Sequence, residues 1–218
     1  FFPSNSRGEG LLIYVAYIAL ALAAARLPRR YINVVLMAIV ISGSLIGAIA
    51  VGQYYGVDAH AWVGLRTLTV NEFYRLTSTP GGSFSFATRS YGTLGNPVFL
   101  GGYAALLLPV IVTLAVQGKA RWWWGYAGAA TLVYAALVGS QTRAAWIPSA
   151  GAAVLLVGWL PRSSQVWRRL ALLAGVFTAV TIIMALTNPR ASLGERAASM
   201  SPRAPSLQER LYIWKHTL

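Results

Sequence analysis

The stretch Arg89–Tyr103, "RSYGTLGNPVFLGGY", places a cation and a Gly-Asn-Pro turn directly before a long apolar run. Pro97 suits the first turn of a helix, where its missing N–H removes no hydrogen bond. Asn96, just before it, can cap the helix or bind a ligand. The following run, residues 98–116, approaches the ~20 apolar residues that a spanning helix needs. We therefore expect a membrane helix to begin at this turn.

The composition of the chain supports a membrane protein. Hydrophobic residues make up 56% of the 218 residues and charged residues 11%, whereas an ordinary soluble domain has about 25% charged residues. The net charge of +13 could suggest nucleic acid, but the cations lie in the connections between apolar runs, so we expect no nucleic-acid partner. The absence of Cys excludes disulfides and thiolate metal sites.

We predict an all-α, polytopic membrane protein with about six transmembrane helices in residues 1–187. Residues 188–218 would begin an extracytoplasmic loop. Ser206 and Glu209 have the spacing of a capping box, which predicts an amphipathic helix at 206–218 that lies along the membrane surface. The six predicted spans are 11–25, 32–55, 98–116, 123–139, 144–160 and 170–187.

The distribution of charge predicts the orientation. Three short connections carry eight Lys and Arg residues and no acidic residue, so the positive-inside rule assigns them to the cytoplasm. The opposite side then receives all five acidic residues of the chain. The three connections are "RLPRR" (26–30), "QGKAR" (117–121) and "PRSSQVWRR" (161–169).

Three arginines on the opposite side could bind an anion: Arg89, Arg143 and Arg210. Arg143 lies in the short "SQTR" turn between two predicted spans, which keeps it close to the membrane boundary. A guanidinium stays charged and can bind two phosphate oxygens at once, which suits a pyrophosphate. The alternative is that each arginine extends to the phosphates of ordinary lipids.

Three pieces of the second half of the chain, taken in order, resemble the bacterial O-antigen ligase and O-antigen polymerase family, which is related to protein O-oligosaccharyltransferases. In that family a Gly-Asn-Pro-like turn opens a span, a Ser-x-Ser-Arg-like turn joins two later spans, and an Arg-x-x-x-Trp helix opens a large extracytoplasmic loop. The three pieces here are "RSYGTLGNPVFLGGYAALLLPV", "LVGSQTRAAWIPSAGAAVLLV" and "SLQERLYIWKHTL".

The resemblance implies a glycosyltransferase of the bacterial cytoplasmic membrane. It would transfer a glycan from a polyprenyl pyrophosphate to a hydroxyl of an acceptor glycan, lipid or protein, with inversion, on the extracytoplasmic face and without a metal or cofactor. The catalytic residues implied are Arg143 and Arg210. The substrate-binding residues implied are Arg89, Asn96, Trp146 and Trp214.

The family also uses a histidine in its large loop as the base that activates the acceptor. Neither His60 nor His216 matches the position of that histidine. We therefore expect the sequence to be a segment of a longer protein and to be inactive alone.

Two other functions are consistent with the sequence. A permease or flippase for an anionic substrate would place ionisable residues near the middle of the membrane, and the six predicted spans contain none there. A non-catalytic structural subunit of a membrane complex would tolerate replacement of the outer arginines.

The predicted orientation can be tested by cysteine labelling of this cysteine-free chain. Single cysteines at Arg29, Lys119 and Ser164 should resist an impermeant thiol reagent in intact cells and react after the membrane is permeabilised, because the positive-inside rule places all three in the cytoplasm. Labelling of two of them in intact cells would contradict the predicted orientation.

Overall fold

The computed structural model describes residues 28–57 and 89–188, together with several positions between Val15 and Arg26. The chain divides into two units, Phe1–Ile39 and Val40–Leu218. The described residues contain helices and no strand, which confirms the predicted all-α class. The elements are α2 (Arg29–Tyr54), α5 (Pro97–Gln117), the 3-10 helix η2 (Ala120–Trp122), α6 (Trp123–Ser140), α7 (Arg143–Trp159) and α8 (Ser164–Thr187).

Three of these helices, α2, α5 and α8, are long and apolar enough to cross a membrane. This finding supports a membrane protein with transmembrane helices. The helices α6 and α7 match the predicted spans 123–139 and 144–160 closely in their bounds. Most of the predicted span 11–25 and the whole predicted helix 206–218 lie outside the described residues.

The largest difference from the prediction concerns the start of α8, which begins at Ser164 rather than at residue 170. The Ser163 hydroxyl oxygen accepts a hydrogen bond from the N–H of Val166, at 3.3 Å, and so caps the helix. The basic residues Arg168 and Arg169 therefore lie within a helix, whereas the sequence had assigned them to a connection.

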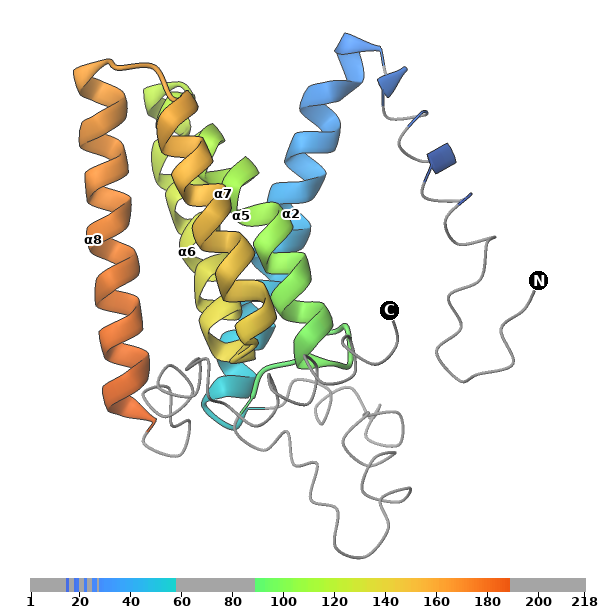
Figure 1. Cartoon of the computed structure of the whole chain (residues 1–218), viewed down its shortest axis with the longest axis vertical. Coiled ribbons are helices and arrows are strands. Elements are labelled where there is room, and N and C mark those ends of the chain that lie inside the picture. The colour runs from blue at the N-terminus through green and yellow to red at the C-terminus, as the bar shows by residue number, and fades with distance from the viewer. Residues whose placement is uncertain are drawn as a thin grey trace, which may run out of the picture. The chain divides into compact units, whose positions relative to one another are not determined.

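Within the unit Val40–Leu218, α5 packs against both α6 and α7, and α8 packs against α6 and more lightly against α5 (Figure 1). The later part of α2 joins this bundle where Ala50, Leu100 and Ala136 form a buried cluster. From α5 to α8, successive helices run in opposite directions because short connections link them.

Glycines allow close approach between the helices. A Cβ built on Gly47 of α2 would lie 2.8 Å from the backbone of Leu132 in α6. A Cβ built on Gly101 of α5 would lie 2.9 Å from Cβ of Thr142 and 3.0 Å from Cβ of Ala145. Small residues at helix contacts are typical of membrane bundles, where packing rather than water exclusion drives association.

We predict that Gly101→Ala destabilises the protein by about 1–3 kcal/mol, because the added methyl group would push α5 away from the start of α7. The neighbouring Gly102→Ala is a matched control, since a Cβ there would meet nothing within 4 Å. Thermal unfolding in one detergent measures both. Equal midpoints for the two variants would contradict the close packing at Gly101.

Candidate functional site

The segment Arg89–Gly92, which leads into α5, is bound to the end of α2 through the side chain of Gln53. Its amide oxygen accepts hydrogen bonds from the N–H groups of Tyr91 and Gly92, at 3.1 and 2.7 Å. Its amide nitrogen donates to the carbonyl of Gly92 at 3.1 Å. One buried side chain thus satisfies three backbone groups of an irregular segment, as a low-dielectric surrounding requires.

Ser90 binds the same segment to two helices. It is fully buried, its hydroxyl donates to the carbonyl of Ala50 at 2.6 Å, and its N–H donates to the carbonyl of Gly139 at 2.9 Å. A Cβ on Gly139 would lie 2.8 Å from the Ser90 hydroxyl, so the glycine leaves the room that this contact needs.

Arg89 reaches the turn between α6 and α7. Its Nε donates to the carbonyl of Ser140 at 3.0 Å, and its Nη2 donates to the hydroxyl oxygen of Thr142 at 3.1 Å. The Thr142 hydroxyl in turn donates to the carbonyl of Pro97 at 2.9 Å. The predicted anion-binding residue Arg89 therefore also has a structural role, because it connects three segments at this end of the bundle.

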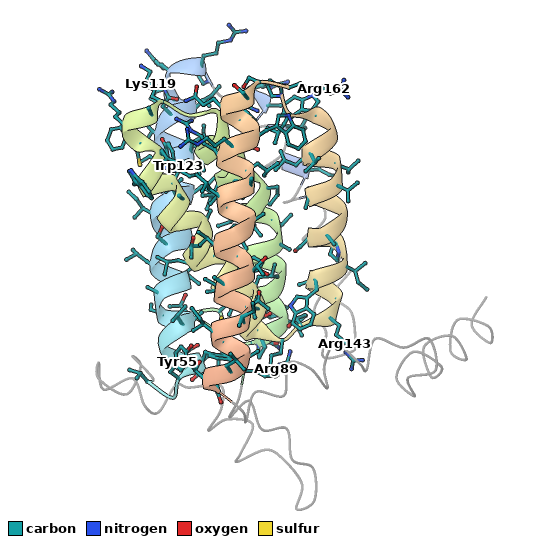
Figure 2. All side chains as sticks on the ribbon, turned by 90° about the vertical axis from the view of Figure 1, so that its left-hand side faces the viewer. Tyr55, Arg89, Lys119, Trp123, Arg143 and Arg162 are labelled. Atoms are coloured by element: carbon teal, nitrogen blue, oxygen red, sulfur yellow. The ribbon has the colours of Figure 1, made fainter. Side chains whose placement is uncertain are left out.

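The "SQTR" turn places Arg143 at the first position of α7. The turn is tight because Gln141 adopts the left-handed conformation, with φ of 50°. Arg143 is half-buried, and Figure 2 shows Arg89 and Arg143 at the same end of the bundle, opposite to Lys119 and Arg162.

Of the other predicted site residues, the structure describes Asn96 and Trp146. Asn96 caps α5, since its side-chain oxygen accepts from the N–H of Val98 at 2.8 Å. Trp146 donates its indole N–H to the carbonyl of Leu137 at 3.1 Å and faces a cavity. Arg210 and Trp214 lie outside the described residues, so their implied roles stay predictions.

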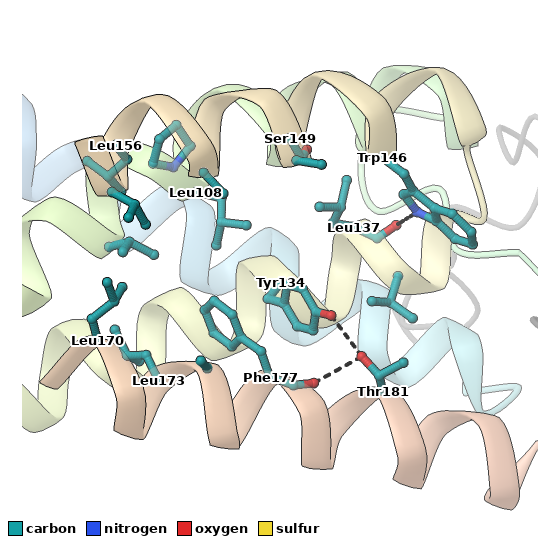
Figure 3. Close-up of a pocket in the computed structure, with 17 residues that line it drawn as sticks. Leu108, Tyr134, Leu137, Trp146, Ser149, Leu156, Leu170, Leu173, Phe177 and Thr181 are labelled. Atoms are coloured by element: carbon teal, nitrogen blue, oxygen red, sulfur yellow. Dashed lines mark hydrogen bonds between the residues drawn. The ribbon is translucent and has the colours of Figure 1, made fainter. Parts of the chain in front are cut away.

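The cavity is an apolar groove between α7 and α8, with α5 and α6 forming its floor, and has a volume of about 610 Å³ (Figure 3). Among the described residues, no charged side chain lines it. On α7 the lining runs from Trp146 to Val157. On α8 it runs from Leu170 to Thr181. We call this cavity the α7–α8 groove.

The few polar side chains in the groove donate their hydrogen bonds within the protein. Thr181 donates to the carbonyl of Phe177 at 2.9 Å, which leaves the Tyr134 hydroxyl to donate to Thr181 at 2.8 Å. The Ser149 hydroxyl donates to the carbonyl of Ala145, and the indole N–H of Trp146 donates to the carbonyl of Leu137. The groove therefore suits a hydrocarbon better than a polar ligand.

Arg143 precedes the part of α7 that lines this groove. Trp146 and Ala150 line the groove, and they follow Arg143 by three and seven residues, the spacing of one helix face. The groove thus ends about one helical turn from a permanent cation. A charged group attached to a long apolar chain would match this arrangement.

Two buried polar residues, Gln53 and Arg169, have roles that sequence reasoning did not find. A lone amide in the otherwise apolar run before "YY" was the available signal for Gln53. Arg169 was counted only as a topological charge, yet it is 8% exposed and donates to two carbonyls at the end of α5.

Comparison with known proteins adds no identification, because no family model, no curated protein and no solved structure matches this chain.

We predict that Thr142→Val lowers the free energy of unfolding by about 1–3 kcal/mol, because it removes the acceptor for Arg89 and the donor to Pro97 without a large change of volume. Thr131→Val is the control, since its hydroxyl donates only within its own helix, to Ala127. Thermal unfolding should separate the two variants. If they unfold alike, the hydrogen bonds around Thr142 do not hold this end of the bundle.

Proposed function

We propose that the chain is part of a membrane glycosyltransferase that resembles the O-antigen ligases. It transfers a glycan from a polyprenyl pyrophosphate to an acceptor hydroxyl on the outer face of a bacterial cytoplasmic membrane. The observation that carries this proposal is the apolar α7–α8 groove, which ends about one helical turn from Arg143.

The groove matches the lipid part of such a donor. The groove is partly open and has a volume of about 610 Å³, so part of a slender isoprenoid chain can lie along it. The apolar lining and the engaged polar groups favour the same occupant.

The cations match the charged part of the donor. In the transfer, the acceptor oxygen bonds to the anomeric carbon, the bond from that carbon to the phosphate oxygen breaks, and the pyrophosphate leaves with the electron pair. Arg143, with Arg210 from the outer loop, stabilises the charge that develops on the leaving oxygen. Arg89 positions the turn that carries Arg143. The acceptor proton passes to a base supplied by the full-length protein.

The membrane arrangement that we propose has six spans. They are the predicted span 11–25, the three helices of sufficient length (α2, α5 and α8), and the shorter helices α6 and α7. A helix of 18 or 17 residues is about 25 Å long, which approaches the ~30 Å of the hydrocarbon core. The end with Lys119 and Arg162 faces the cytoplasm, and the end with Arg89 and Arg143 faces outward.

We predict that Arg143→Ala abolishes glycan transfer by the purified full-length protein while its thermal unfolding midpoint stays near that of the wild type. Arg143→Lys keeps the charge but not the planar two-pronged geometry, so it should restore only part of the turnover. Arg30→Ala, which replaces an exposed arginine in the first turn of α2, is the control and should keep full turnover.

Retention of wild-type turnover by Arg143→Ala would refute the proposed site. Absence of transfer by the unmutated full-length protein with every lipid-linked donor would favour a structural subunit. Movement of a lipid-linked anion across liposomes without transfer would favour a flippase.

A further inference from the structure

The end of the bundle opposite to Arg143 carries a second arrangement of cations. Arg169 of α8 is buried, with 8% exposure, and its Nη1 donates to the carbonyls of Val116 and Gly118 at 3.2 and 2.7 Å. Its guanidinium carbon lies 5.4 Å from the centre of the Trp123 ring. These contacts hold the guanidinium at the end of α5.

The carbonyls at the end of a helix carry only about half a negative charge together, so they neutralise Arg169 in part. No acidic residue is present in the described segments 28–57 and 89–188. The Nε and Nη2 groups of Arg169 make no hydrogen bond with any described residue. A buried arginine therefore retains positive charge and donor groups that an anion can use.

Two further cations follow the carbonyl that Arg169 binds. Lys119 and Arg121 directly follow the Gly118 carbonyl that Arg169 binds, and both are exposed. Arg121 lies over the ring of Trp122, at 5.5 Å from its centre. Arg169 thus joins α8 to the segment between α5 and α6. Figure 2 shows Lys119, Trp123 and Arg162 at this end of the bundle.

We propose that Arg169, Lys119 and Arg121 bind the phosphate of an anionic phospholipid, a site separate from the proposed donor site. The charge is complementary, and basic pockets between membrane helices are suited to such headgroups. Tryptophan side chains favour the depth at which headgroups lie. Exposed Trp122 ends η2, and exposed Trp124 lies in the first turn of α6. These features favour a lipid over a soluble phosphate.

The test measures binding of phosphatidylglycerol and phosphatidylcholine to the purified full chain in detergent by native mass spectrometry. We expect phosphatidylglycerol to bind about tenfold more tightly, because it keeps a net negative charge, whereas the choline cation offsets the phosphate charge of phosphatidylcholine. Lys119→Gln/Arg121→Gln should remove most of this preference. Arg29→Gln/Arg30→Gln removes the same charge from the first turn of α2 and should change the binding less than about twofold.

Arg169→Gln should also lose the preference for phosphatidylglycerol. Because this variant loses two buried hydrogen bonds and so can fail to fold, the double variant of the exposed residues Lys119 and Arg121 provides the independent test. Equal affinity for the two lipids would overturn the proposal, and so would equal weakening by the two double variants, which would indicate diffuse attraction only. Displacement of phosphatidylglycerol by millimolar inorganic phosphate would indicate a soluble-phosphate site and would also overturn it.

Discussion

The arrangement of this bundle depends on how the irregular segment Arg89–Gly92 satisfies its backbone among apolar helices. Gln53 binds three of its backbone groups, Ser90 reaches Ala50 and Gly139, and Arg89 reaches the turn before α7. Backbone polar groups without partners would cost several kcal/mol each in an apolar medium. These hydrogen bonds therefore fix the ends of α2, α5 and α6 relative to one another and set where α7 begins.

The described cations lie toward the helix ends, and the apolar groove lies between them. At one end Arg89 and Arg143 flank the turn between α6 and α7, while at the other Arg169 closes the end of α5. Arginine in the hydrocarbon core costs about 2.5–3.5 kcal/mol or more, so its placement at the boundaries is favourable. The cations at the two ends have different surroundings: Arg143 is followed on α7 by the apolar groove, and Arg169 contacts Trp123.

The sequence predicted the helical class and the bounds of α5, α6 and α7 within a few residues, because Pro97 and the tight "SQTR" turn are strong local signals. It also identified Asn96 as a possible cap. It did not predict the long-range hydrogen bonds of Gln53 or Arg169, since these depend on helix packing that no local pattern encodes. It did not predict the α7–α8 groove either, because a gap between helices arises from how they pack.

The central claim is that the α7–α8 groove receives the lipid chain of a pyrophosphate donor whose charged group lies at Arg143. A cryo-electron microscopy structure of the full-length protein with a polyprenyl pyrophosphate tests it most directly. The account predicts a continuous, slender density along Leu108, Phe177 and Trp146 that ends in two phosphates within hydrogen-bonding distance of Arg143. A protein helix filling the groove, or a donor bound elsewhere with Arg143 facing lipid, would contradict it.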